Sequence, residues 1–120
     1  GILDYHFDVD FLEENDGLIL YPHYTDRIIP GWLDKKLTFR KPSPAHMEKV
    51  ILLAPSRAWV ARLPYRKIPD RNDFFRFKGS DRTRMAYWRS VVNASKRLAD
   101  TFWDAVESGR IRQMVKPMPQ

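Results

Sequence analysis

The residue types best suited to hold a metal ion lie within the first ten positions. Asp4, His6, Asp8 and Asp10 alternate with apolar residues, which places them on one face of an extended segment. Carboxylates and imidazoles are common ligands of divalent cations. Neighbouring members of such a face are, however, about 6.5 Å apart along a strand, which spreads them too widely around one ion. We therefore expect a solvated polar face and no metal.

Ser56 is placed like the nucleophile of a serine hydrolase, between the apolar run 50–54 and a helical stretch. A nucleophile elbow needs small neighbours, because the serine occupies a tight and strained turn. Pro55 before the serine and Arg57 after it fit that turn poorly. A serine at the start of a helix also caps it. We expect Ser56 to be a helix cap, and we identify no catalytic residue in the chain.

A third candidate is the segment 62–84, called the basic-aromatic segment below. Its cations alternate with Tyr65, Phe74, Phe75 and Phe77. Proteins that bind single-stranded nucleic acid combine cations with stacking rings, and membrane-surface segments combine cations with interfacial aromatic residues. A third interpretation is that the phenylalanines pack into the core and the cations are simply solvated. The candidate residues for binding an anionic surface are Arg66, Lys67, Arg71, Arg76, Lys78 and Arg82.

The uneven distribution of charge supports an anionic partner. The net charge is +6, yet the chain has seven acidic residues and no Lys or Arg before Arg27. Twelve basic and three acidic residues lie between Arg57 and Arg97. Such a block creates a positive field that attracts phosphate-rich partners. We expect an anionic membrane surface first and nucleic acid second.

The bulk composition is that of a globular domain of 120 residues with 43% apolar residues and no cysteine. The lack of cysteine excludes disulfides and thiolate metal sites, and it fits a reducing compartment. No apolar run reaches the roughly 20 residues that span a bilayer. We expect a cytoplasmic protein, peripheral to a membrane where its basic surface binds one, that uses no cofactor.

The periodicity of the sequence predicts an α/β fold. Residues 2–11 alternate strictly and 17–21 form a second apolar run, so the two could pair as a hairpin. The unbroken run 50–54 predicts a buried, parallel strand. A short helix should follow from Arg57 to about Leu63, where Pro64 ends it.

A long helix is predicted over residues 81–108, with Gly109 at its C-terminal cap. Its apolar stripe is wide, which suits packing on a sheet better than a two-stranded coiled coil. We expect Trp88, Leu98 and Phe102 to be buried. The stripe consists of Met85, Trp88, Val91, Val92, Leu98, Ala99, Phe102 and Val106. The predicted architecture is a partial sheet with an N-terminal extended pair, one buried parallel strand and this long helix packed on it, forming a single fragment over 1–120.

Several segments resemble a bacterial branch of the patatin-like phospholipases. The opening residues 1–5 are similar to those that follow the Asp-Gly motif of that family, and 49–56 is similar to a later buried strand. Segments 16–23, 28–32 and 67–71 share the same resemblance. It implies that the chain is the C-terminal part of a serine acyl hydrolase acting on phospholipid or related esters through a Ser–Asp dyad. The dyad would lie upstream of this chain, because the sequence contains no Gly-x-Ser-x-Gly motif.

Overall fold

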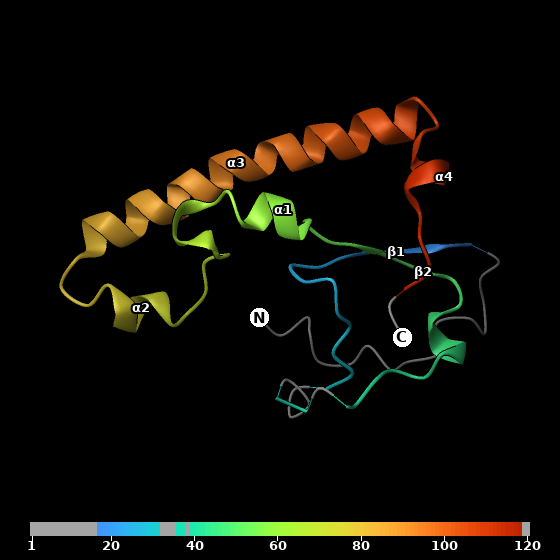
Figure 1. Cartoon of the computed structure of the whole chain (residues 1–120), viewed down its shortest axis with the longest axis horizontal. Coiled ribbons are helices and arrows are strands. Elements are labelled where there is room, and N and C mark those ends of the chain that lie inside the picture. Colours follow the sequence, from blue (N-terminus) through green and yellow to red (C-terminus); the bar gives the residue numbers. More distant parts are fainter. Residues whose placement is uncertain (1–16, 32–35, 38, 119–120) are drawn as a thin grey trace. The chain divides into compact units, whose positions relative to one another are not determined.

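The computed structural model describes residues 17–31, 36–37 and 39–118, and its chain folds as an α/β protein, as predicted (Figure 1). Its contacts group into two compact units. The first runs to Ala54 and includes the chain end from Pro117, and the second comprises Pro55–Lys116. The predicted strand 2–11 and the polar face formed by Asp4, His6, Asp8 and Asp10 lie outside the described residues.

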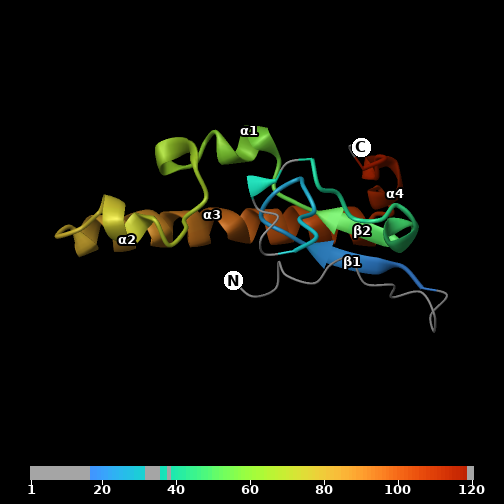
Figure 2. The ribbon, with the colours of Figure 1, turned by 90° about the horizontal axis from the view of Figure 1, so that it is seen from below.

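The first unit contains a two-stranded parallel sheet (Figure 2). Strand β1 (Ile19–Pro22) pairs with β2 (Val50–Leu53), and Ile19 lies opposite Val50. The parallel orientation predicted for the second strand is confirmed. Pro22 closes the first strand, where its missing N–H removes no central hydrogen bond, and the next amide, that of His23, donates to the carbonyl of Leu53 over 2.8 Å.

The long connection between the two strands supplies much of the core of this unit. It contains a short 3-10 helix, η3 (Ala45–Met47), and buries Ile28 and Met47 against Val50. Partly buried apolar side chains pack around these three: Ile19, Tyr21, Leu52 and Met118. A parallel pair needs such a crossover, because its strands cannot be joined by a tight turn.

The second unit is helical. It contains α1 (Arg57–Val60), a 3-10 turn η4 (Pro64–Arg66), α2 (Asp73–Arg76), the long helix α3 (Asp81–Glu107) and α4 (Ile111–Met114). The single long helix predicted for residues 81–108 is confirmed. Gly79 and Gly109 adopt positive φ angles of 78° and 71° at the two ends of α3, a conformation that costs glycine least.

Helix α3 buries a narrower and rotated part of the predicted stripe. Its buried residues are Tyr87, Val91 and Ala105, whereas Trp88, Leu98 and Phe102 are only partly buried. The prediction that these last three are buried is therefore wrong. Tyr87 lies outside the predicted stripe; its hydroxyl donates to the backbone carbonyl of Lys67, so its ring can enter the core with the polar group satisfied.

The core of the second unit lies where α3 meets the basic-aromatic segment. Leu63, Phe77, Tyr87 and Val91 form a buried cluster. Trp59, Ile68, Trp88 and Ala94 pack around it. The first half of α3 therefore fixes the segment that precedes it in sequence.

Among the described residues, no helix combines the length and the apolar character needed to cross a membrane.

We expect Tyr87→Phe to lower the free energy of unfolding by about 1 kcal/mol, because it removes the donor to the partly buried carbonyl of Lys67. Urea unfolding followed by circular dichroism measures the change. Tyr65→Phe is the matched control: Tyr65 is 47% exposed, so its hydroxyl is solvated and its removal should cost less than about 0.5 kcal/mol. Equal costs for the two variants would show that the Tyr87 hydroxyl has no structural role.

Candidate functional site

The carboxylate of Asp73 organises the basic-aromatic segment. Asp73 begins α2, is fully buried, and is the only buried charged residue in the described part of the chain. Its two oxygens accept hydrogen bonds from the ammonium of Lys67 at 2.9 Å, the backbone amide of Asp70 at 3.0 Å and the indole N–H of Trp88 at 3.0 Å. One side chain thus ties the loop 67–70 and helix α3 to α2.

These contacts determine the charge state of the pair. Burial alone would raise the pKa of the Asp73 carboxyl, but the hydrogen bonds from Lys67, Asp70 and Trp88 outweigh it and hold this pKa below its ordinary value. Burial likewise acts to lower the pKa of Lys67, but the contacts with Asp73 and Asp70 outweigh that effect and raise it. Both groups are therefore charged at neutral pH. The burial of Tyr87, together with the nearby Asp73 carboxylate, raises the pKa of the tyrosine.

The turn before this centre has a strained backbone. Tyr65 and Arg66 both adopt left-handed conformations, with φ angles of 59° and 52°, which costs residues other than glycine about 1 kcal/mol or more each. Aromatic contacts offset part of this cost. The Tyr65 ring packs edge-on against Phe77 at 5.4 Å and Tyr87 at 4.9 Å, and the Arg76 guanidinium lies 4.4 Å from its centre.

The three phenylalanines of the segment have different environments. Phe77 is buried in the core. Phe74 is half-exposed and packs edge-on against Trp88, with the Arg84 guanidinium 4.1 Å from its ring centre. Phe75 is 81% exposed, and no ring or cation contact to it is found within the described residues. Exposing so much of an apolar ring to water is unfavourable. Phe75 is therefore a good candidate for contact with an apolar partner.

Five of the six candidate cations are exposed, and Lys67 is partly buried. Lys67 forms ion pairs with Asp73 and Asp70, so its contacts hold the fold together and we leave it out of the surface defined below. Among the described residues, no acidic partner is found for the exposed Arg66, Arg71, Lys78 or Arg82. Arg76 is exposed and is oriented by the Tyr65 ring. We call Phe74, Phe75, Arg71, Arg76, Lys78 and Arg82 the α2 surface.

Arg84 has a different role from the exposed cations. Its side chain is 15% exposed, pairs with Asp81 at 3.2 Å, and contacts the rings of Phe74 and Trp88. Its Nε atom is buried without a hydrogen-bond partner. The residue thus acts as a packing element that supports Phe74 and thereby α2.

Ser56 is a helix cap, in agreement with the expectation from sequence. Its hydroxyl accepts a hydrogen bond from the amide of Trp59 at 3.1 Å. Its φ and ψ angles of −67° and 150° are ordinary extended values, whereas a nucleophile elbow is strained. The serine therefore completes α1 and has no feature of an activated nucleophile.

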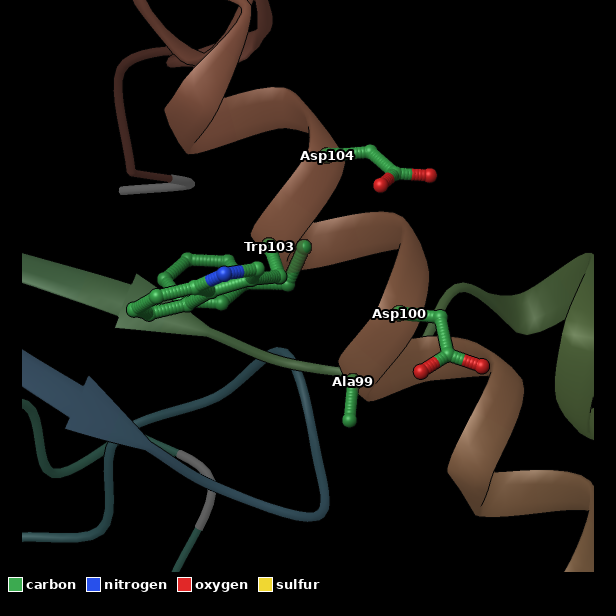
Figure 3. A pocket seen from close by; sticks show the side chains of 5 residues that line it. Ala99, Asp100, Trp103 and Asp104 are labelled. Carbon is green, nitrogen blue, oxygen red and sulfur yellow. The ribbon is translucent and has the colours of Figure 1, made fainter.

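No metal cluster is found in the described part of the chain. No group of three or more His, Asp or Glu side chains there could hold a metal ion. A hollow on α3 is lined by Ala99, Asp100, Phe102, Trp103 and Asp104 (Figure 3). Two like-charged carboxylates beside apolar groups, with no nucleophile or cation among the lining residues, give this hollow no evident chemistry.

No family model, no curated protein and no solved structure matches the chain. The resemblance to patatin-like phospholipases stays a prediction.

We expect Ser56→Ala to lower the free energy of unfolding by about 1 kcal/mol, the usual effect of losing a helix cap. The same variant should leave hydrolysis of a short p-nitrophenyl ester at the background level of the unmodified chain. Ser43→Ala is the control variant in the activity assay, because it removes a different serine hydroxyl. Turnover above background that disappears only in Ser56→Ala would identify Ser56 as a nucleophile and contradict its assignment as a cap.

Asp73 should make stability dependent on acid pH. Its folded pKa lies below the unfolded value of about 3.9, so the ionised carboxylate stabilises the protein above that pH. The stabilisation is lost as the pH falls through the folded pKa. We expect Asp73→Asn to lower the free energy of unfolding by about 2–4 kcal/mol at pH 7.

The difference between the unmodified chain and Asp73→Asn should shrink as the pH is lowered from about 5 to 2, as measured by urea unfolding at each pH. Asp104→Asn, an exposed aspartate on α3, should stay within about 0.5 kcal/mol of the unmodified chain throughout. A difference for Asp73→Asn that is constant across this range would show that its ionisation is not linked to folding.

Proposed function

We propose that the chain binds peripherally to anionic membrane surfaces through the α2 surface. The observation that carries this proposal is the exposure of Phe75 on a short helix surrounded by exposed cations. Interfacial binding combines the insertion of an apolar group with attraction of basic residues to anionic headgroups. Both components are present within residues 71–82.

The geometry of α2 suits insertion because contacts with the rest of the second unit hold both of its ends in place. Asp73 fixes its first residue to Lys67 and Trp88, and Phe77 enters the core directly after its last residue. Phe74 and Phe75 lie between these two anchors. Figure 1 shows α2 beside the N-terminal end of α3, at the turn that joins the two helices. Preorganisation of this kind reduces the conformational entropy lost on binding.

Nucleic acid is the competing partner for the same cations. A single-stranded nucleic-acid surface needs several exposed rings on which successive bases stack. Here Phe77 is buried and one face of Phe74 is occupied by Arg84, which leaves Phe75 as the freely exposed ring of the segment's phenylalanines. A single phenylalanine ring that is free of ring and cation contacts, set among cations, fits a membrane interface better than a track of stacked bases.

The predicted origin of the chain in a patatin-like lipid acyl hydrolase is compatible with this function. An enzyme acting on phospholipid esters works at a lipid surface, and a basic surface with an exposed aromatic ring would help it to bind there. The identity of the parent protein and its ester substrate stay predictions. The membrane binding proposed here does not depend on them, since it follows from residues of this chain.

We expect the chain to co-sediment with vesicles that contain phosphatidylserine, and to release them as salt shortens the Debye length from about 10 Å at 0.1 M to 3 Å at 1 M. Phe75→Ala should weaken binding about tenfold, because it removes the inserting group. Lys78→Gln should weaken it about fivefold, since each basic residue near an anionic surface contributes about 1 kcal/mol.

Matched controls lie elsewhere in the chain. Phe39→Ala removes a ring that is 75% exposed in the first unit, and Arg112→Gln removes an exposed cation of α4. Neither should change binding more than about twofold if the α2 surface makes the contact. Equal losses for Phe39→Ala and Phe75→Ala would mean that no specific surface is used. Binding to single-stranded DNA without binding to vesicles would replace the membrane proposal by the nucleic-acid one.

A further inference from the structure

Helix α3 exposes an apolar stripe that the core does not use. Met85, Val92 and Trp103 are 52%, 60% and 60% exposed, and Val106 is 39% exposed. Ala99 between them is exposed as well. We call these five residues the exposed α3 stripe. At 100° per residue they gather on one side of the helix, roughly 120–140° from the side that holds Tyr87, Val91 and Ala105.

Four residues of this stripe repeat with the spacing of one position of a coiled-coil heptad. Met85, Val92, Ala99 and Val106 follow one another at intervals of seven residues. A strict seven-residue repeat keeps apolar side chains on one line of contact between two supercoiled helices. The core of the second unit does not require this repeat, because it contacts a different face of α3.

The charges beside the stripe change sign along the helix. Arg82 and Arg89 flank its first half, and Asp100 and Glu107 flank its second half on the same side. Within the described residues no ion-pair partner is found for any of these four. A parallel partner helix would place like charges together, whereas an antiparallel copy of the same helix would place the basic half beside the acidic half.

We propose that two copies of this chain associate through the exposed α3 stripe as an antiparallel, two-fold symmetric helix pair. With the axis between Ser95 and Lys96, Met85 lies opposite Val106 of the second copy and Val92 lies opposite Ala99. The same register places Arg89 near Asp100 of the second copy, and Arg82 near Glu107. It also places Trp103 opposite Trp88, whose ring is partly exposed.

Figure 3 shows that Trp103 and the two carboxylates leave different sides of the C-terminal half of α3. Trp103 projects from one side of the helix, and Asp100 projects from another together with Asp104. An apolar side chain can therefore enter the seam while a carboxylate stays at its rim, the arrangement found in stable helix pairs. Lys96 lies close to the two-fold axis. It is four residues from Asp100 of its own chain, a spacing at which the two side chains can form an ion pair on the helix surface.

Sedimentation equilibrium and light scattering test the association. The chain of 14.3 kDa should convert to a species of twice that mass as its concentration rises through the micromolar range. Val92→Glu, which places a charge in the seam, should remove the dimer and leave the helical circular dichroism unchanged. Ser90→Glu introduces the same charge at an exposed position outside the stripe and should leave the dimer intact. A chain that remains monomeric up to about 200 μM would overturn the proposal.

Charge reversal and cross-linking test the orientation. Arg89→Glu and Asp100→Arg should each raise the dissociation constant about tenfold, and the double variant should restore it to within about twofold, because it re-forms both pairs with opposite sign. Since the chain has no cysteine, Met85→Cys and Val106→Cys can be introduced alone.

In the antiparallel pair, residues 85 of the two copies are about 30 Å apart along the axis. Met85→Cys should then form a disulfide readily with Val106→Cys in a mixture and not with itself. Self-linking of Met85→Cys that is as fast as the mixed reaction would show a parallel pair and overturn the proposal, as would a double charge variant weaker than either single one. The vesicle assay on Val92→Glu is a separate measurement, since Val92 is not one of the residues of the α2 surface.

Discussion

The second unit depends on one buried carboxylate. Burying an ionised group costs several kcal/mol unless hydrogen bonds replace its water, and Asp73 receives three donors from three parts of the chain. Without it, Lys67 would lose its buried partner, the Trp88 indole its acceptor, and the start of α2 its anchor. The basic-aromatic segment places Leu63 and Phe77 in the apolar core, and the polar centre at Asp73 fixes the part between them.

This polar centre explains how the same short segment can be both rigid and exposed. Phe77 and the ring of Tyr87 lie in the core, and Asp73 forms the polar contacts. The segment is therefore anchored at residues 73 and 77, and the residues between these two can stay exposed. Phe74 is supported from one side by Arg84 and Trp88. Phe75 is left in solvent, on a helix that cannot rotate to bury it. Binding to an apolar partner would remove this exposed apolar area from water.

The sequence predicted the elements better than the side-chain environments. Local signals determined the parallel strand 50–53, the cap at Ser56 and the long helix ending near Gly109, because apolar periodicity, capping chemistry and glycine conformations act over a few residues. The role of Lys67 could not be read in the same way. It looked like one more surface cation, and only a fold that brings Asp73 and Trp88 together shows that it is a structural one. One feature of the sequence does point to this polar centre. Asp70 and Asp73 are two acidic residues close together in a segment that is otherwise basic.

The wide apolar stripe of α3 was predicted as one surface packed on a sheet, and its two edges have different surroundings. One edge, with Tyr87 and Val91, packs into the core of the second unit. The other keeps Met85, Val92 and Trp103 more than half exposed. A stripe wider than one packing partner can cover leaves apolar area in water, at roughly 25 cal/mol for each Å². The proposed pairing of two copies would remove part of that area from water along the 27 residues of the helix, and the distribution of charge favours the antiparallel orientation.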